Sequence, residues 1–178
     1  VDMAGSVSSV LDITQRPSQA EIRLKTDSTV TAALSLLDEA PFNFMTKAGR
    51  PVALGEGRAR LDALLRLPLV KKVELNDVRY EVAGRLTNLR SEVLVPGRVL
   101  TADALDLTAN PRGMTIAGPG RIGTVAFDVT YAQGFRPEDR GRATVKGQVE
   151  LSPATVKEFD LGLPEGMVLV DGGTIGLV

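Results

Sequence analysis

Three pairs of carboxylates are the residues best placed, by type and spacing, to do acid–base chemistry. A glycoside hydrolase needs two carboxyl groups about 5 to 10 Å apart in a cleft. Neighbouring residues on a β-strand point to opposite faces, so adjacent carboxylates on a strand do not converge. Two of the pairs sit beside prolines in expected turns, and the third fits the polar positions of a strand with a local irregularity. Solvated positions are therefore favoured over catalysis for Asp38/Glu39, Glu138/Asp139 and Asp103/Asp106.

The other usual sources of chemistry are missing or weak. The chain has no Cys and no His, which excludes disulfides, thiolate or imidazole metal ligands, and Ser-His-Asp triads. The motifs Gly55-x-Gly57 and Gly118-x-Gly120 lack the spacing, the Lys-Ser/Thr pair and the following helix of phosphate-binding loops, and we expect them to form hairpin turns. We therefore predict no enzymatic activity, no cofactor and no metal.

Composition points to an aliphatic β protein. Of 178 residues 43% are hydrophobic, yet only 4% are aromatic, with two Tyr and no Trp, which disfavours a sugar-processing enzyme. The net charge is −1 with both signs mixed along the chain, so no basic face predicts a nucleic-acid partner. No stretch approaches the roughly 20 apolar residues of a membrane-spanning helix. From its two ends we interpret residues 1–178 as one β-rich segment of a longer protein.

Alternation of apolar and polar residues predicts strands, each with one apolar and one polar face. It is clean in Ala20–Lys25, Ala126–Tyr131 and Ala143–Leu151, and in Val73–Val82 it slips once, at Asn76-Asp77, as at a bulge or tight turn. Turn residues recur about every ten positions, which indicates antiparallel pairing. They include Gly49–Pro51, Pro96-Gly97, Asn110–Gly113, Gly118–Gly120 and Gly134–Asp139.

Helices are expected to be few and short. Thr31–Asp38 contains helix formers but is equally compatible with a strand, and Pro153–Phe159 follows Ser152 as a plausible N-cap. The predicted fold is therefore all-β: an antiparallel, repeat-built curved sheet, trough-like or sandwich-like, with at most one or two short helices.

Internal similarity indicates two to three tandem β units, approximately 50–112 and 113–178. Gly55–Gly57 recurs 63 residues later as Gly118–Gly120, and Val82–Leu86 recurs as Val145–Val149 at the same offset. A third fragment, Pro96–Asp103, is echoed by Pro164–Asp171. Repeats of this spacing are typical of stacked arrays, in which each unit buries its apolar side against its neighbours.

The apolar face of these strands is the remaining candidate for function. In a closed sandwich its side chains are simply core. On an open trough they suit acyl chains, because each buried CH₂ contributes roughly 0.8 kcal/mol without any polar anchor. The candidate lipid-facing residues are Val73, Leu75, Val78, Tyr80, Val82, Ile116, Phe127, Val129, Tyr131, Val145 and Val149.

The rhythm of short strands and turns over about residues 50–151 resembles the AsmA-like family of Gram-negative envelope proteins. Within it, the large YhdP-type members with a central domain of unknown function are the most similar, and these are related to TamB-like bridge-like lipid transfer proteins. The segments that carry the resemblance are Gly55–Leu61, Leu67–Leu69, Val73–Val78, Gly84–Leu89, Leu100–Leu107 and Met114–Gly120.

The resemblance implies a periplasmic location, in a protein anchored to the inner membrane outside this segment. It also implies an apolar groove that guides phospholipid acyl chains between the inner and outer membranes. It supplies no catalytic residues. The alternative is a closed β module that spaces other domains or aids assembly of outer-membrane proteins. The first 40 residues match the family pattern poorly.

Overall fold

The computed structural model describes residues 1–12, 17–39, 44–47, 49–71, 73, 77–139, 142–151 and 173–177. These residues form one nine-stranded sheet with two short helices and a 3-10 turn. The strands are β1 (Val7–Asp12), β2 (Gln19–Thr29), β3 (Glu56–Pro68), β4 (Arg79–Ser91), β5 (Leu100–Asn110), β6 (Gly113–Ile122), β7 (Val125–Gly134), β8 (Ala143–Leu151) and β9 (Gly173–Leu177).

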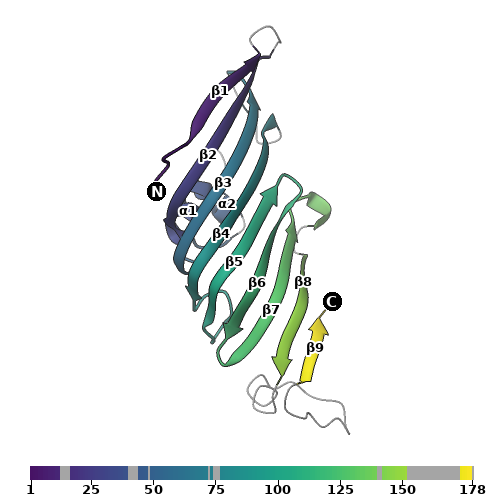
Figure 1. The fold of residues 1–178 in the computed structure, drawn as a ribbon. Coiled ribbons are helices and arrows are strands. Elements are labelled where there is room, and N and C mark those ends of the chain that lie inside the picture. Colours follow the sequence, from purple (N-terminus) through teal and green to yellow (C-terminus); the bar gives the residue numbers. More distant parts are fainter. Residues whose placement is uncertain are drawn as a thin grey trace.

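The sheet is an antiparallel meander in which every strand pairs with the one before it in sequence. Figure 1 shows the strands side by side in chain order, from β1 in purple to β9 in yellow, as a curved and unclosed sheet. The predicted all-β antiparallel architecture is confirmed. The described residues form one layer, without a second sheet packed on the first.

The strand register sorts the side chains into two faces. Val82 pairs with Ala63 and Ala109, and Ile116 pairs with Leu107 and Tyr131, so aliphatic residues lie beside one another from strand to strand. We call this side the apolar face. From β3 to β8 it comprises Ala59, Leu61, Ala63, Leu65, Tyr80, Val82, Gly84, Leu86, Leu89, Ala102, Leu105, Leu107, Ala109, Met114, Ile116, Gly118, Gly120, Phe127, Val129, Tyr131, Val145, Gly147 and Val149.

Two adjacent irregularities bend the sheet. Residue 57 of β3 faces residues 88–89 of β4, and the extra residue is accommodated at Asn88, whose φ is 51°. Residues 102–105 of β5 face residues 118–120 of β6, so β5 also has one residue more than its partner. Extra residues of this kind increase local twist and coiling. They also explain why Leu86 and Leu89, three apart on β4, are both buried.

Helices α1 (Val30–Asp38) and α2 (Phe44–Lys47) lie between β2 and β3 in sequence, behind the sheet in the view of Figure 1. The Thr29 hydroxyl caps α1 by accepting a hydrogen bond from the Ala32 N–H at 3.1 Å. Thr31–Asp38, compatible with helix or strand in the sequence, is therefore helical. The buried cluster sits between α1 and the bends of β4 and β5 and contains Val30, Ala59, Leu86, Leu89, Ala102 and Leu105.

Most predicted turns are found, but the two glycine motifs predicted as hairpin turns are not. Pro96-Gly97 and Asn110–Gly113 connect consecutive strands, and Gly134 ends β7 before the 3-10 turn η2 (Pro137–Asp139). Gly118–Gly120 is not a turn; it lies inside β6. Pro119, which has no N–H to donate, is tolerated there because the β5–β6 pairing is interrupted opposite it. Gly55–Gly57 is not a hairpin turn either, because β3 begins at Glu56.

The predicted repeat is partly visible in the sheet. Val82–Leu86 and Val145–Val149 occupy β4 and β8, and the central Gly84 and Gly147 both belong to the apolar face. Gly55–Gly57 opens a strand whereas Gly118–Gly120 lies within one. The sheet runs without a break through the turn at residues 111–112, where a second unit is expected to begin. Pro153–Phe159 and Pro164–Asp171 fall outside the described residues.

Candidate functional site

Eight of the eleven predicted lipid-facing residues lie together on the apolar face. They are Tyr80, Val82, Ile116, Phe127, Val129, Tyr131, Val145 and Val149. Seven are half-buried and Val145 is 41% exposed, although no second layer of described residues covers them away from α1. Val78 immediately precedes β4, Val73 lies in the β3–β4 connection rather than on a strand, and Leu75 is outside the described residues.

The sequence pattern missed the part of the apolar face nearest α1. Four buried residues of this part were not among the predicted lipid-facing candidates. They are Leu86, Leu89, Ala102 and Leu105, each 4 to 9% exposed. The signal was present as pairs of apolar residues three apart within strands, Leu86/Leu89 and Ala102/Leu105. Strict alternation does not produce that spacing, but alternation interrupted by one extra residue does.

At its glycines the apolar face has no Cβ, so large side chains from the adjacent strand lie flat against the backbone there. A Cβ on Gly84 would stand 2.3 Å from Leu61 Cδ2, and one on Gly120 would stand 2.4 Å from Phe127 Cζ. Each would also meet a carbonyl oxygen of the neighbouring strand, at 2.6 Å and 2.8 Å. Such close approach of the next strand on this side indicates a sheet that curls toward its apolar face, at positions where glycine allows the bend.

One end of the apolar face is closed by polar groups. The Tyr131 hydroxyl donates to Gln133 Oε1 at 3.2 Å, and Gln133 Nε2 donates to the carbonyls of Gly134 and Arg142 at 3.0 and 2.8 Å. Burial raises the pKa of the other tyrosine, Tyr80. The apolar strip therefore passes from aliphatic side chains to a phenol and an amide at the end of β7.

The opposite face of the sheet is polar and held by ion pairs between adjacent strands. Glu21 is 6% exposed and bonds Arg23 and Arg66, at 3.0 and 2.9 Å. The guanidinium groups of Arg66 and then Arg23 hold the pKa of this carboxyl below its ordinary value.

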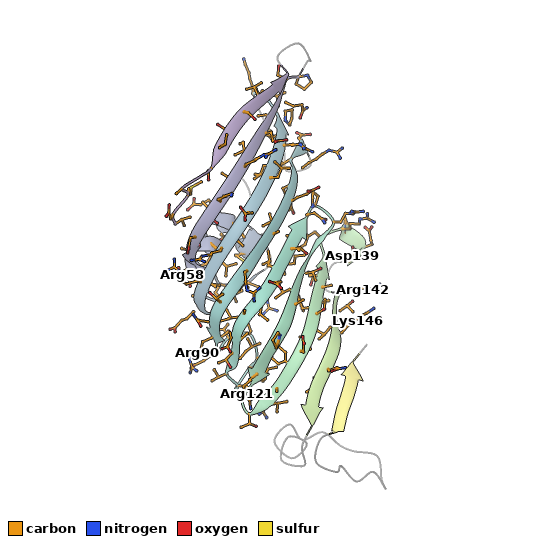
Figure 2. All side chains as sticks on the ribbon, viewed as in Figure 1. Arg58, Arg90, Arg121, Asp139, Arg142 and Lys146 are labelled. Carbon is orange, nitrogen blue, oxygen red and sulfur yellow. The ribbon has the colours of Figure 1, made fainter. Side chains whose placement is uncertain are left out.

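Asp27 repeats this arrangement further along β2. It binds Arg60 at 2.8 Å and also contacts Arg58, and both arginines lower its pKa. Figure 2 shows Arg58, Arg90 and Arg121 toward one end of the strands and Asp139 and Arg142 toward the other.

The three carboxylate pairs lie in separate elements: Asp38/Glu39 at the end of α1, Asp103/Asp106 in β5 and Glu138/Asp139 in η2. Asp38 ends α1 and accepts hydrogen bonds from the Thr46 N–H at 2.8 Å and the Thr46 hydroxyl at 2.7 Å, which lower its pKa. It is thus engaged in joining two helices rather than simply solvated. Asp106 pairs with Arg85 at 3.2 Å, beside the extra residue of β5, as the predicted local irregularity implies. Glu138 and Asp139 lie in η2.

Surface hollows, acidic clusters and long apolar helices among the described residues do not extend the candidate site. A shallow hollow of about 280 Å³ is lined by Thr108, Asn110, Arg112 and Thr115, and another of about 210 Å³ lies beside Asp27 and Arg60. The described residues contain no group of three or more acidic side chains able to hold a metal ion. They also contain no helix long and apolar enough to cross a membrane.

Comparison of the chain with family models, with curated proteins and with solved structures finds no match.

Proposed function

We propose that the apolar face binds the acyl chains of phospholipids and has no chemistry of its own. One observation carries the proposal: a continuous aliphatic surface spans β3 to β8 of a single-layer, unclosed sheet, and only α1 and α2 among the described elements lie on it. Exposed apolar surface of this extent marks an interaction site in soluble proteins. An acyl chain matches it because the lining is apolar along its length and polar at one end, at Tyr131 and Gln133.

The wider role follows from the resemblance alone. We propose that this segment belongs to a periplasm-spanning protein, anchored to the inner membrane elsewhere in the polypeptide, and guides phospholipid between the two membranes. Its partners are then lipid and the remainder of the same chain.

The chain contains its own reporter for acyl binding. It has no Trp and two Tyr, and both Tyr80 and Tyr131 belong to the apolar face. Phosphatidylcholine with brominated acyl chains quenches tyrosine on contact. We expect it to quench the emission of the purified protein, whereas the unbrominated lipid does not. Tyr80→Phe and Tyr131→Phe variants then assign the quenching to the β4 or the β7 region of the face, and native mass spectrometry counts the bound lipids.

A charge on the face provides the matched control. Val145→Glu places a carboxylate at the most exposed of the predicted positions that the structure describes, where water can reach it, and so should leave the fold intact while abolishing lipid binding. Lys146→Glu changes the neighbouring residue of β8 on the polar face and should bind lipid normally. A folded wild-type protein that takes up no phospholipid would contradict the proposal and favour the structural module.

A further inference from the structure

Helix α1 occupies part of the surface that we assign to acyl chains. Val30 belongs to the buried cluster, and Ala33 and Leu34 pack against that cluster. These contacts are apolar, as those of a hydrocarbon chain would be. The helix therefore competes for the same surface that continues, uncovered by described elements, onto β6, β7 and β8.

The fit of α1 to the sheet is incomplete on both of its sides. Beneath it, the Ser28 hydroxyl on β2 is buried, in a residue 5% exposed, and has no hydrogen-bond partner. A buried hydroxyl without a partner opposes the covered arrangement. On its other side, Leu36 is 48% exposed, and no charged residue occurs between Val30 and Leu37. A helix that is apolar on both sides is typical of one that is enclosed on both sides.

The attachments of α1 are few and lie at its ends. Thr31 donates a hydrogen bond to the Gly55 carbonyl at 3.3 Å, and Asp38 accepts two from Thr46 of α2. Between these points, the inner side of α1 meets the rest of the described residues through apolar packing of Val30, Ala33 and Leu34. Such packing is replaced without loss by another apolar group of similar volume.

We propose that α1 is a movable cover and that the surface beneath it, Ala59, Leu86, Leu89, Ala102 and Leu105, is a second part of the acyl site. A lipid bound on β6 to β8 extends under the helix and takes over its contacts with the sheet. The Ser28 hydroxyl becomes accessible to water when the helix lifts. This inference rests on the proposed acyl binding and concerns where the chain lies.

The absence of cysteine from the sequence makes a direct test possible, because one introduced thiol reports one position. Leu34→Cys places a thiol on the inner side of α1, and Leu36→Cys places one on the outer side. The rate of alkylation by N-ethylmaleimide is measured with and without palmitoyl-lysophosphatidylcholine below its critical micelle concentration. Lifting of the cover should raise the Leu34→Cys rate about tenfold and change the Leu36→Cys rate less than about twofold.

A second variant separates a movable cover from ordinary core packing. Ser28→Ala removes the hydroxyl that opposes the covered state, so in the Leu34→Cys background it should slow alkylation about threefold without lipid. If Leu34→Cys fails to fold, judged by far-ultraviolet circular dichroism, Ala33→Cys replaces it at the neighbouring half-buried position.

Native mass spectra of the same samples distinguish the outcomes. Lysolipid bound with an unchanged Leu34→Cys rate would overturn the movable cover and leave acyl binding standing. Absence of any complex would overturn both.

Discussion

Single residues decide the shape of the apolar face more than its chemistry. Gly84 and Gly120 each lie under a large side chain from the adjacent strand, Leu61 and Phe127. Those side chains lie flat because no Cβ lifts them, and they stay half-buried without a second layer. A smooth aliphatic surface therefore depends on residues that contribute no side chain at all.

We expect Gly84→Ala to destabilise the protein. Its Cβ would enter the space of Leu61 Cδ2 and approach the Arg60 carbonyl, so the strand or the leucine must move. Overpacking of this kind costs about 1–3 kcal/mol in free energy of unfolding, which urea titration followed by circular dichroism measures. Ala83→Val on the polar face of the same strand is the control and should be within about 0.5 kcal/mol of wild type. Equal effects of the two substitutions would contradict the packing argument.

Acid should destabilise the fold through three carboxylates, two on the polar face and one at the end of α1. The pKa values of Glu21, Asp27 and Asp38 are lowered in the folded state, so the unfolded chain binds more protons in acid. The stability that they contribute is present above the unfolded carboxyl pKa of about 4 and is lost as the pH falls below it. Urea midpoints should therefore decrease from about pH 5 to pH 3.

The Glu21→Gln variant measures how much one of these carboxylates contributes to the loss of stability in acid. The variant should be less stable than wild type at pH 7, and the difference should shrink as the pH falls below the unfolded carboxyl pKa, because the wild type then loses the contribution of the ionised Glu21 carboxylate. Glu81→Gln, an exposed carboxylate on β4 without an ion pair among the described residues, serves as the control. A constant difference between Glu21→Gln and wild type at all pH values would contradict the assignment to titration.

At the scale of the elements, two strands with one residue too many shape the sheet. β4 and β5 are neighbours, and their extra residues lie at the same level, next to α1. Leu86, Leu89, Ala102 and Leu105 flank these extra residues and share one buried cluster with Val30 of α1. The buried cluster thus forms where the regular pattern of alternation fails.

Asn88 tests the role of the irregularity in β4. Its φ of 51° is a left-handed conformation that asparagine tolerates and β-branched residues do not. Asn88→Gly should leave the free energy of unfolding within about 0.5 kcal/mol of wild type, whereas Asn88→Val should cost about 1–2 kcal/mol. Thermal unfolding of both variants provides the measurement. A Val variant as stable as the Gly variant would show that residue 88 is free to adopt an extended conformation.

Regular elements could be predicted from the sequence, and interrupted ones could not. Alternation identified Ala126–Tyr131 and Ala143–Leu151 as strands because each runs through a regular ladder. Gly118–Gly120 was assigned to a turn because glycine and proline are typical of turns, but a break in the β5–β6 pairing admits them to a strand. Cross-strand partners such as Glu21 and Arg66 are 45 residues apart in sequence. The local pattern of residues does not determine the strand register, so these ion pairs could not be predicted.

The whole molecule has more surface than a compact protein of its size. Its accessible surface is 12065 Å² for a mass of 18.9 kDa. Scaling for folded monomers predicts about 8,300 Å² for that mass. An open sheet explains the excess, since one layer cannot bury both of its faces. A function that covers the apolar face with another molecule is consistent with this surface.

Apolar surface that is open in the native state should bind a hydrophobic dye. We expect 8-anilinonaphthalene-1-sulfonate to fluoresce with the native protein at pH 7, and palmitoyl-lysophosphatidylcholine to displace it from the same surface. In a partly unfolded protein the dye signal rises as denaturant loosens the packing. Here it should instead fall with urea in the same transition as the far-ultraviolet circular dichroism, because dye and lipid both require the intact sheet. If the dye does not fluoresce with the native protein, the apolar face is covered in solution. Acyl binding would then require the cover to be displaced first.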